Sequence, residues 1–185
     1  AQPKDVSVIT GEKAIFEVTA TGTDVTYQWK IDRNDGKGFA DITGANGASY
    51  TTGVTDKDCN GFKYRCVIRN AAGAITTDTV VLTVKEKYTI TAAAGAHGSI
   101  SPSGNVEVVE GSSQTFVITA EEGYEIESLT VDGTAVSAVA DYTFENVTAA
   151  HTIAVTFKQQ YKIIDGANSS WTQSTDGSGS IRIRG

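Results

Sequence analysis

Apolar residues alternate with polar ones in many short runs of this chain, and this period of two most limits its possible folds. Successive side chains of a β-strand point to opposite faces, so each run predicts a strand with one buried face. Leucine occurs only at Leu82 and Leu129 and methionine is absent, which leaves little material for long amphipathic helices. The sequence therefore predicts an all-β protein. The clearest runs are Ala14, Phe16, Val18 and Ala20; Val25, Tyr27, Trp29 and Ile31; and Phe62, Tyr64, Cys66 and Ile68.

Turn-forming sequences divide the first 86 residues at short intervals. Residues 34–36, 44–47 and 70–73 are rich in Asn, Asp, Gly and Ala and separate the predicted strands. A long Thr/Val run over residues 75–84 is typical of one final strand. Several short strands at this spacing are typical of a β-sandwich, so we expect a first domain over residues 1–86.

Three motifs in this segment resemble the bacterial immunoglobulin-like domain. They are Phe-x-Val-x-Ala at 16–20, Tyr-x-Trp at 27–29, and Tyr-x-Cys at 64–66 before the turn at 70–73. The resemblance implies a sandwich in which Trp29 packs between the sheets and Tyr64 forms a corner. Val18 stands where antibody domains have the first cysteine of their inter-sheet disulfide, so apolar packing is expected there instead.

The two cysteines, Cys59 and Cys66, are predicted to be free thiols. An extended strand over residues 62–66 spans about 13 Å, whereas a disulfide needs Cα atoms within about 7 Å. A disulfide stays an alternative if Cys59 folds back along the strand. We expect Cys66 in the core and Cys59 in the preceding turn. No histidine or third ligand lies nearby in sequence, so no metal site is predicted.

A second set of alternating runs fills residues 87–158, with a strong hairpin signal at Asp132-Gly133. Seven phrases in order resemble the divergent internalin-type B-repeat of modular surface proteins of Gram-positive bacteria (Firmicutes). They begin at Tyr88, Gly98, Gly111, Gly123, Val131, Tyr142 and His151. We expect residues 98–104 to form a turn-rich connector in this second small all-β repeat domain.

This second segment predicts a small core. A domain of about 70 residues buries little surface, and packing against a neighbour would help it. The expected core residues are Phe116, Tyr124, Ile126, Leu129, Tyr142, Phe144, Ile153 and Phe157.

Charge is distributed unevenly along the chain. Residues 1–86 carry ten basic and eleven acidic side chains, whereas residues 87–158 carry two and nine. Because phosphate contacts need clustered Lys and Arg, this balance argues against a nucleic-acid partner. The acidic segment indicates a solvated surface, with calcium binding as the alternative. The acidic loop at 32–38 is one residue short of a calcium loop, and its glycines favour a hairpin.

We predict no catalytic, cofactor-binding or metal-binding residues and no cofactor. His97 lies in a Gly-flanked turn, and His151 starts the last strand, where an exposed polar residue is expected. The acidic residues Glu121, Glu122, Glu125 and Glu127 could suggest paired catalytic carboxylates. Glu125 and Glu127 share one strand face, however, which we expect to be the outer face, opposite Ile126.

Residues 159–185 resemble the start of a third, truncated immunoglobulin-like module. We expect a hairpin centred on Trp171 or an added edge strand in this β tail. The chain starts without Met or a signal sequence, which suggests an excised piece or a mature fragment. No apolar run approaches the roughly 18 residues that span a bilayer, so no membrane insertion of this segment is expected.

These features predict a non-catalytic structural, spacer or adhesion segment of a secreted or cell-surface multidomain bacterial protein. Its expected partners are an unknown protein or glycan at the cell surface and neighbouring modules of the same polypeptide. The alternative is a carbohydrate-binding accessory module of an extracellular polysaccharide-active enzyme, which needs an exposed aromatic platform. Trp29 is predicted to be buried, so Trp171 is the remaining large candidate.

Overall fold

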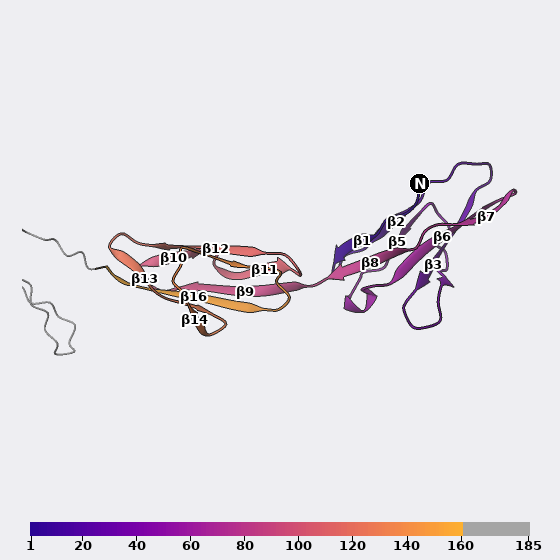
Figure 1. Cartoon of the computed structure of the whole chain (residues 1–185). Helices are drawn as coiled ribbons and strands as arrows, with labels where there is room; N and C mark the ends of the chain where they lie inside the picture. The colour runs from indigo at the N-terminus through magenta and orange to yellow at the C-terminus, as the bar shows by residue number, and fades with distance from the viewer. Residues whose placement is uncertain (161–185) are drawn as a thin grey trace, which may run out of the picture.

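The computed structural model describes residues 1–160, and these residues form strands connected by turns and one short 3-10 helix (Figure 1). The strands within residues 6–85 surround one hydrophobic core, and those within residues 87–159 surround another. We call residues 1–86 the N-terminal unit and residues 87–160 the C-terminal unit. The two units follow each other end to end in Figure 1. The predicted all-β fold class is confirmed.

The N-terminal unit is a sandwich of a large and a small sheet. In the large sheet the strands follow the order β1, β8, β6, β3, β4, and β7 also pairs with β6. Strand β1 runs parallel to β8, while the other pairs are antiparallel. The bounds are β1 Val6–Ile9, β3 Thr26–Asp32, β4 Ala40–Asp41, β6 Lys63–Asn70, β7 Gly73–Thr76 and β8 Val80–Lys85; the small sheet pairs β2 Ile15–Glu17 with β5 Ser49–Thr51, and the 3-10 helix η1 spans Lys57–Cys59.

Aromatic rings fill the core of the N-terminal unit. Trp29 is fully buried, and its indole N–H donates to the Gly47 carbonyl at 3.1 Å. Phe16 stacks on Tyr64 with ring centroids 4.4 Å apart, and burial raises the pKa of Tyr64. Val18 is buried among these residues. The expected positions of Trp29 between the sheets and of Val18 in apolar packing are therefore confirmed. Tyr64 lies in the same core, and its role as a corner stays a prediction.

The predicted single final strand over residues 75–84 is wrong, because Thr77 divides it into β7 and β8. The Thr77 side chain turns inward and is buried. Its hydroxyl accepts a hydrogen bond from the Cys66 N–H at 2.9 Å and donates to the Asp78 carbonyl at 3.0 Å. A side-chain hydroxyl thus takes the place of a backbone partner on β6, and the regular ladder is interrupted there.

The C-terminal unit also contains two sheets. One has the order β11, β9, β16, β13, β14, and the other has the order β10, β12, β15. Strands β9 and β16 run parallel, and the remaining pairs are antiparallel. The bounds are β9 Lys87–Ala94, β10 Gly98–Ser101, β11 Gly104–Val109, β12 Gln114–Ala120, β13 Tyr124–Val131, β14 Thr134–Val136, β15 Asp141–Phe144 and β16 His151–Gln159.

Most of the predicted core of the C-terminal unit is found. Phe116, Leu129, Phe144, Ile153 and Phe157 are buried, and the partly buried Ile126 and Tyr142 pack against them. Tyr124 is the exception, since it lies outside the core. As the first residue of β13 it reaches the neighbouring turn, and its ring stacks on His97 with centroids 3.9 Å apart.

The expected connector at residues 98–104 is also corrected by the structure. Residues 98–101 form β10, which pairs with β12 and buries Ile100 in the core. The Gly- and Ser-rich sequence resembles a turn, but these small residues let the strand lie close to the core. The predicted hairpin at Asp132-Gly133 is confirmed, because both residues have positive φ and connect β13 to β14.

Candidate functional site

The carboxylates singled out from the sequence do not converge on one site. Glu125 forms an ion pair with Lys158 at 3.3 Å, and Glu127 accepts a hydrogen bond from the Thr156 hydroxyl at 3.4 Å. Glu121 lies 3.4 Å from the His97 ring nitrogen. Within residues 1–160 no group of three or more His, Cys, Asp or Glu side chains is placed to hold a metal ion. Each of these contacts connects surface side chains of neighbouring strands or turns, and none of them joins the others in a common site.

His151 connects a hairpin to the last strand. Its Nδ1 lies 2.7 Å from Asp132 Oδ2, and the other Asp132 oxygen accepts the Thr152 N–H at 2.8 Å. The hydrogen bond from His151 lowers the pKa of Asp132, with a further contribution from the Thr152 amide. His151 was expected to be exposed, but its side chain is partly buried and paired. The arrangement is a tie between the β13–β14 turn and β16.

The acidic loop at residues 32–38 is a hairpin, as predicted. Asn34, Gly36 and Gly38 all adopt positive φ between β3 and β4. Its carboxylates are used inside the loop: Asp32 accepts the Asn34 N–H at 2.8 Å, and Asp35 pairs with Lys37 at 3.1 Å. Hydrogen bonds from Lys37 lower the pKa of Asp35.

Both cysteines are free thiols, which confirms the favoured prediction. Cys66 is fully buried in the core, and Cys59 is partly buried in η1. Burial raises the pKa of both thiols. A raised pKa reduces the thiolate fraction, so neither position has the electrostatic character of a reactive cysteine.

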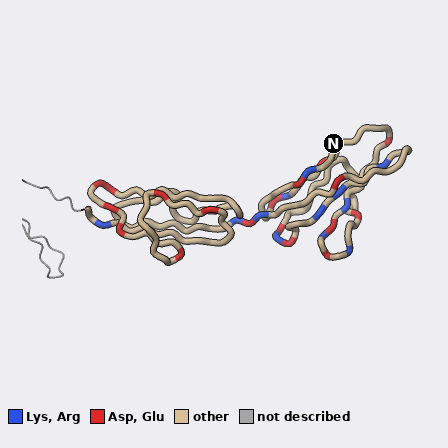
Figure 2. The backbone as a smooth tube through the Cα atoms, in the orientation of Figure 1, with Lys and Arg blue, Asp and Glu red and all other residues tan. Residues whose placement is uncertain are grey.

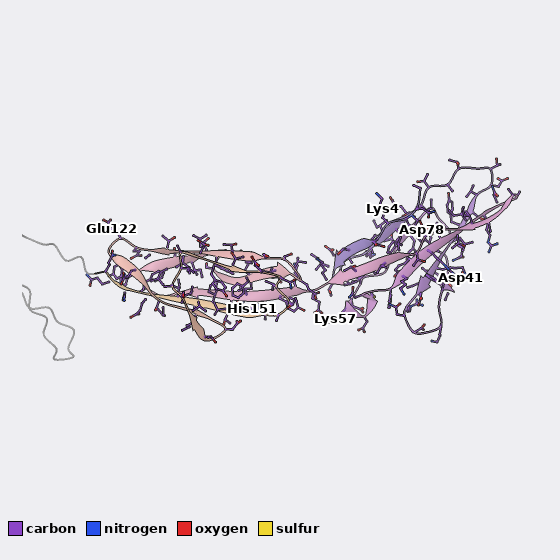
Figure 3. All side chains as sticks on the ribbon, in the orientation of Figure 1. Lys4, Asp41, Lys57, Asp78, Glu122 and His151 are labelled. Carbon is purple, nitrogen blue, oxygen red and sulfur yellow. The ribbon has the colours of Figure 1, made fainter. Side chains whose placement is uncertain are left out.

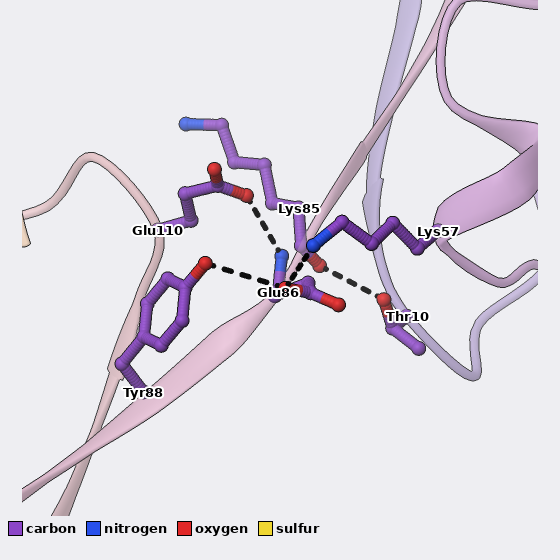
Figure 4. Close-up of polar contacts among 6 residues, drawn as sticks. All are labelled: Thr10, Lys57, Lys85, Glu86, Tyr88 and Glu110. Atoms are coloured by element: carbon purple, nitrogen blue, oxygen red, sulfur yellow. Dashed lines mark hydrogen bonds and ion pairs between the residues drawn. The ribbon is translucent and has the colours of Figure 1, made fainter. Parts of the chain in front are cut away.

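Several polar contacts between distant parts of the chain lie where the two units meet (Figure 4). Strand β8 ends at Lys85 and β9 begins at Lys87, so Glu86 alone connects them. The Glu86 carbonyl accepts the Glu110 N–H at 2.8 Å, and the Glu86 N–H donates to the Glu110 carboxylate at 3.2 Å. Both backbone groups of the connecting residue are therefore satisfied by the C-terminal unit.

The Glu86 side chain is contacted from both units. Lys57, from η1 of the N-terminal unit, places its Nζ 3.1 Å from Glu86 Oε2, and the Tyr88 hydroxyl of the C-terminal unit lies 3.3 Å from the same oxygen. The hydrogen bond with Glu86 raises the pKa of Lys57, and burial is the main cause that raises the pKa of Tyr88. We call Lys57, Glu86, Tyr88 and Glu110 the junction cluster.

The N-terminal unit adds a backbone contact beside the junction cluster. The Thr10 N–H and hydroxyl both donate to the Lys85 carbonyl, at 2.9 and 3.3 Å. The sequence predicts a domain boundary here but not these contacts, because Thr10, Lys57 and Glu110 are far from Glu86 along the chain. No local motif marks them.

Comparisons with known proteins agree with part of the sequence interpretation. Residues 88–161 match the family model described as the divergent InlB B-repeat domain, which confirms the expected resemblance of this segment. A stretch of 85 residues, 45% of the chain, is 36% identical to Endoglucanase C of Cellulomonas fimi. The chain spans 7% of the length of that relative.

Two solved structures illustrate the structural likeness. The N-terminal four Ig domains of Dscam1 isoform 8.4 are 13% identical with a TM-score of 0.42, over 84% of this chain and 44% of that chain. Sidekick-1 immunoglobulin domains 1–5 are 12% identical with a TM-score of 0.42, over 92% of this chain and 39% of that one. In the described part of the chain, no helix is long and apolar enough to cross a membrane.

Proposed function

We propose that residues 1–86 and 87–158 are two tandem domains of an extracellular, multidomain bacterial protein. In this proposal the chain has no catalytic role and holds the modules that flank it at a fixed spacing and angle. The observation that carries the proposal is the one-residue connection at Glu86, whose backbone and side chain are all engaged.

A connection of this length restricts motion. The mean end-to-end distance of a flexible linker grows with the square root of its number of residues, so a one-residue linker allows very little movement. Hydrogen bonds to both backbone groups of that residue reduce its conformational freedom further. Each surface ion pair is worth only about 0–1 kcal/mol, so Lys57 alone does not hold the joint. The restraint comes from the short connection and the polar contacts acting together.

The comparisons support the wider setting of this proposal. The B-repeat match and the partial similarity to an endoglucanase both suit an accessory segment of a larger exported protein. We place the segment outside the cell, secreted or attached to the surface of a Gram-positive bacterium. Adhesion to a protein or glycan is a role that such a spacer would support.

Distance measurement between the two units tests the spacer function. Spin labels would be attached at Lys4→Cys and Glu122→Cys, two exposed positions in different units (Figure 3). The background would carry Cys59→Ser, because Cys59 is partly exposed. Cys66 can stay, because it is fully buried and does not react with the label. Pulsed electron resonance should give a narrow distance distribution for the otherwise unchanged protein. A short Gly-Ser segment inserted after Glu86 should broaden it markedly.

A matched control separates the connection from the ion pair. Lys57→Gln keeps the connection length and removes only the charge, so it should broaden the distribution much less than the insertion. The spacer proposal fails if the parent protein already shows a distribution as broad as that of the insertion variant.

The endoglucanase similarity favours one second candidate, a carbohydrate-binding accessory module. Sugar rings are usually bound on exposed aromatic side chains. Every aromatic side chain in residues 1–160 is buried or partly buried, and Trp171 lies outside the described residues. Retention of the full chain on insoluble cellulose, lost in Trp171→Ala, would support this candidate over a passive spacer.

A further inference from the structure

One face of the N-terminal unit carries a row of basic side chains. On β6, Tyr64, Cys66 and Ile68 point into the core, so Lys63, Arg65 and Arg69 point to the outer face. The register places Lys30 of β3 directly opposite Arg65. Figure 2 shows basic positions in blue and acidic positions in red along the strands of the N-terminal unit. We call Lys30, Lys63, Arg65 and Arg69 the basic face.

The basic face has more cations than anions to neutralise them. Asp41 forms an ion pair with Lys30, and Asp32 lies opposite Lys63 on the neighbouring strand. One Asp32 oxygen already accepts the Asn34 N–H at 2.8 Å. The face therefore has a local positive excess, although the whole N-terminal unit contains slightly more acidic than basic residues.

Arg65 is held in place and lacks a full set of acceptors. Its guanidinium lies 3.9 Å from the centroid of the Phe39 ring, a cation–π contact that fixes the plane of the group. Its buried Nε has no hydrogen-bond partner within the described residues. Because Nε is buried, a ligand outside the protein cannot reach it. An anionic group would instead meet the terminal guanidinium nitrogens, since Arg65 forms no ion pair within residues 1–160.

The spacing of the basic face suits an extended ligand. Alternate residues on one side of a strand are about 6.6 Å apart, and neighbouring strands lie about 4.8 Å apart. Lys63 and Arg65 are thus neighbours along β6, and Lys30 lies beside Arg65 on β3. Arg69 lies further along the strand, beyond the buried Val67. A linear polymer with repeated acidic groups can contact several of these cations at once, whereas a small anion contacts one or two.

Two polyanions other than a polysaccharide could meet the basic face: a single-stranded nucleic acid and a second copy of the chain. Single-stranded nucleic acids rely on bases stacked on aromatic rings, and no aromatic side chain in residues 1–160 is fully exposed. A second copy of the chain would offer its acidic C-terminal unit. There, Glu107 and Glu125 are paired with Lys87 and Lys158, at 2.9 and 3.3 Å, but the exposed Glu122, Asp141 and Glu145 form no ion pair within residues 1–160. A second copy is therefore one of the outcomes that the test must separate from a glycan.

We propose that the basic face binds a linear anionic polysaccharide through its carboxylate or sulfate groups. The acidic C-terminal unit does not prevent this, because charges are screened beyond about 8 Å at physiological ionic strength. The proposal goes beyond the spacer function and does not depend on it.

Calorimetric titration of the full chain with polygalacturonate, at low and at physiological salt, tests the proposal. Binding should weaken as salt rises. The double variant Lys63→Gln/Arg69→Gln, which leaves the Arg65–Phe39 contact in place, should bind about ten-fold more weakly if each lost ion pair contributes roughly 0.7 kcal/mol. Heparin, tested in parallel, distinguishes a sulfated from a carboxylated ligand, and saturable binding of either supports the proposal.

The matched control is Lys4→Gln/Lys13→Gln, which removes two exposed charges away from the basic face. It should bind as the parent protein does. The proposal is overturned if neither polyanion binds better than neutral dextran, if the control weakens binding equally, or if single-stranded DNA binds more tightly than both glycans. Salt-sensitive dimers that disappear in Lys63→Gln/Arg69→Gln, without glycan binding, would assign the face to a second copy instead. The distance distribution between the labelled units should be unchanged in the double variant.

Discussion

Gly98 occupies a position at the start of β10 where a side chain has no room. A Cβ atom at this residue would lie 2.3 Å from the Phe157 ring, which is buried in the core of the C-terminal unit. Its backbone is not in the left-handed region, so space and not conformation selects glycine here. The Gly-Ser sequence that suggests a connector is thus explained by close packing.

Replacing Gly98 with alanine should destabilise the C-terminal unit. The added methyl group must displace the Phe157 ring, and overpacking of a core typically costs about 1–3 kcal/mol. Urea unfolding followed by far-ultraviolet circular dichroism measures the change. Gly95→Ala is the control, because its nearest contact would be at an ordinary 3.5 Å. Equal stability of the two variants would contradict this account of Gly98.

At the scale of elements, β13 shows how pairing modifies a regular alternation. Ile126 pairs with Phe157, but Ser128 pairs with Thr156, so Glu127 is an extra residue in a β-bulge. As a result Ile126 and Leu129, three residues apart, both contact the core. Glu125 and Glu127 still face outward, as expected. Strict alternation would place Leu129 on their side of the strand, but the bulge turns Leu129 to the core side.

The Asp132 turn gives a pH-dependent contribution to the β13–β14 hairpin. Because the folded pKa of Asp132 is lowered from 3.8, its stabilising effect is present above that value and is lost as pH falls through the lower, folded pKa. Asp132→Asn keeps a residue that tolerates positive φ but removes the charge. We expect a loss of about 0.5–1 kcal/mol near neutral pH, since about half of the Asp132 side chain is exposed and solvent screens the pair.

Urea unfolding of the parent and Asp132→Asn proteins checks this expectation. The difference in free energy of unfolding should be present at about pH 6 and should shrink as the pH falls below 3.8. Asp141→Asn, which changes an exposed carboxylate outside the turn, serves as control. A difference that persists unchanged in acid would rule out the ion pair as its cause.

At the scale of the whole molecule, two separate cores are joined through Glu86 and its polar neighbours. The buried residues of each unit pack within that unit. The contacts across the junction are the hydrogen bonds between Glu86 and the C-terminal residues Glu110 and Tyr88. Such contacts orient the units but couple the unfolding of one unit to the other only weakly, so each unit should unfold independently.

Phe116→Ala tests this independence. Phe116 is fully buried, and truncating a buried phenylalanine typically costs about 3–5 kcal/mol. Hydrogen exchange read by mass spectrometry should show reduced protection in β9–β16 and unchanged protection in β1–β8. Phe16→Ala, the corresponding change in the N-terminal core, should give the reverse pattern. Loss of protection in both units from either change would show one cooperative core.

Local sequence patterns were enough to predict the fold class, the buried face of most strands and the tight turns, and they favoured free cysteines over a disulfide. Side-chain direction along a strand and positive φ in Asn- and Gly-rich turns are local properties, so the positions of Trp29, Cys66 and Asp132 follow from their neighbours in sequence. The break at Thr77, the bulge at Glu127, the junction cluster and the basic face could not be predicted in this way. Each of these depends on which distant strands pair and in which register, and that information is absent from any local pattern.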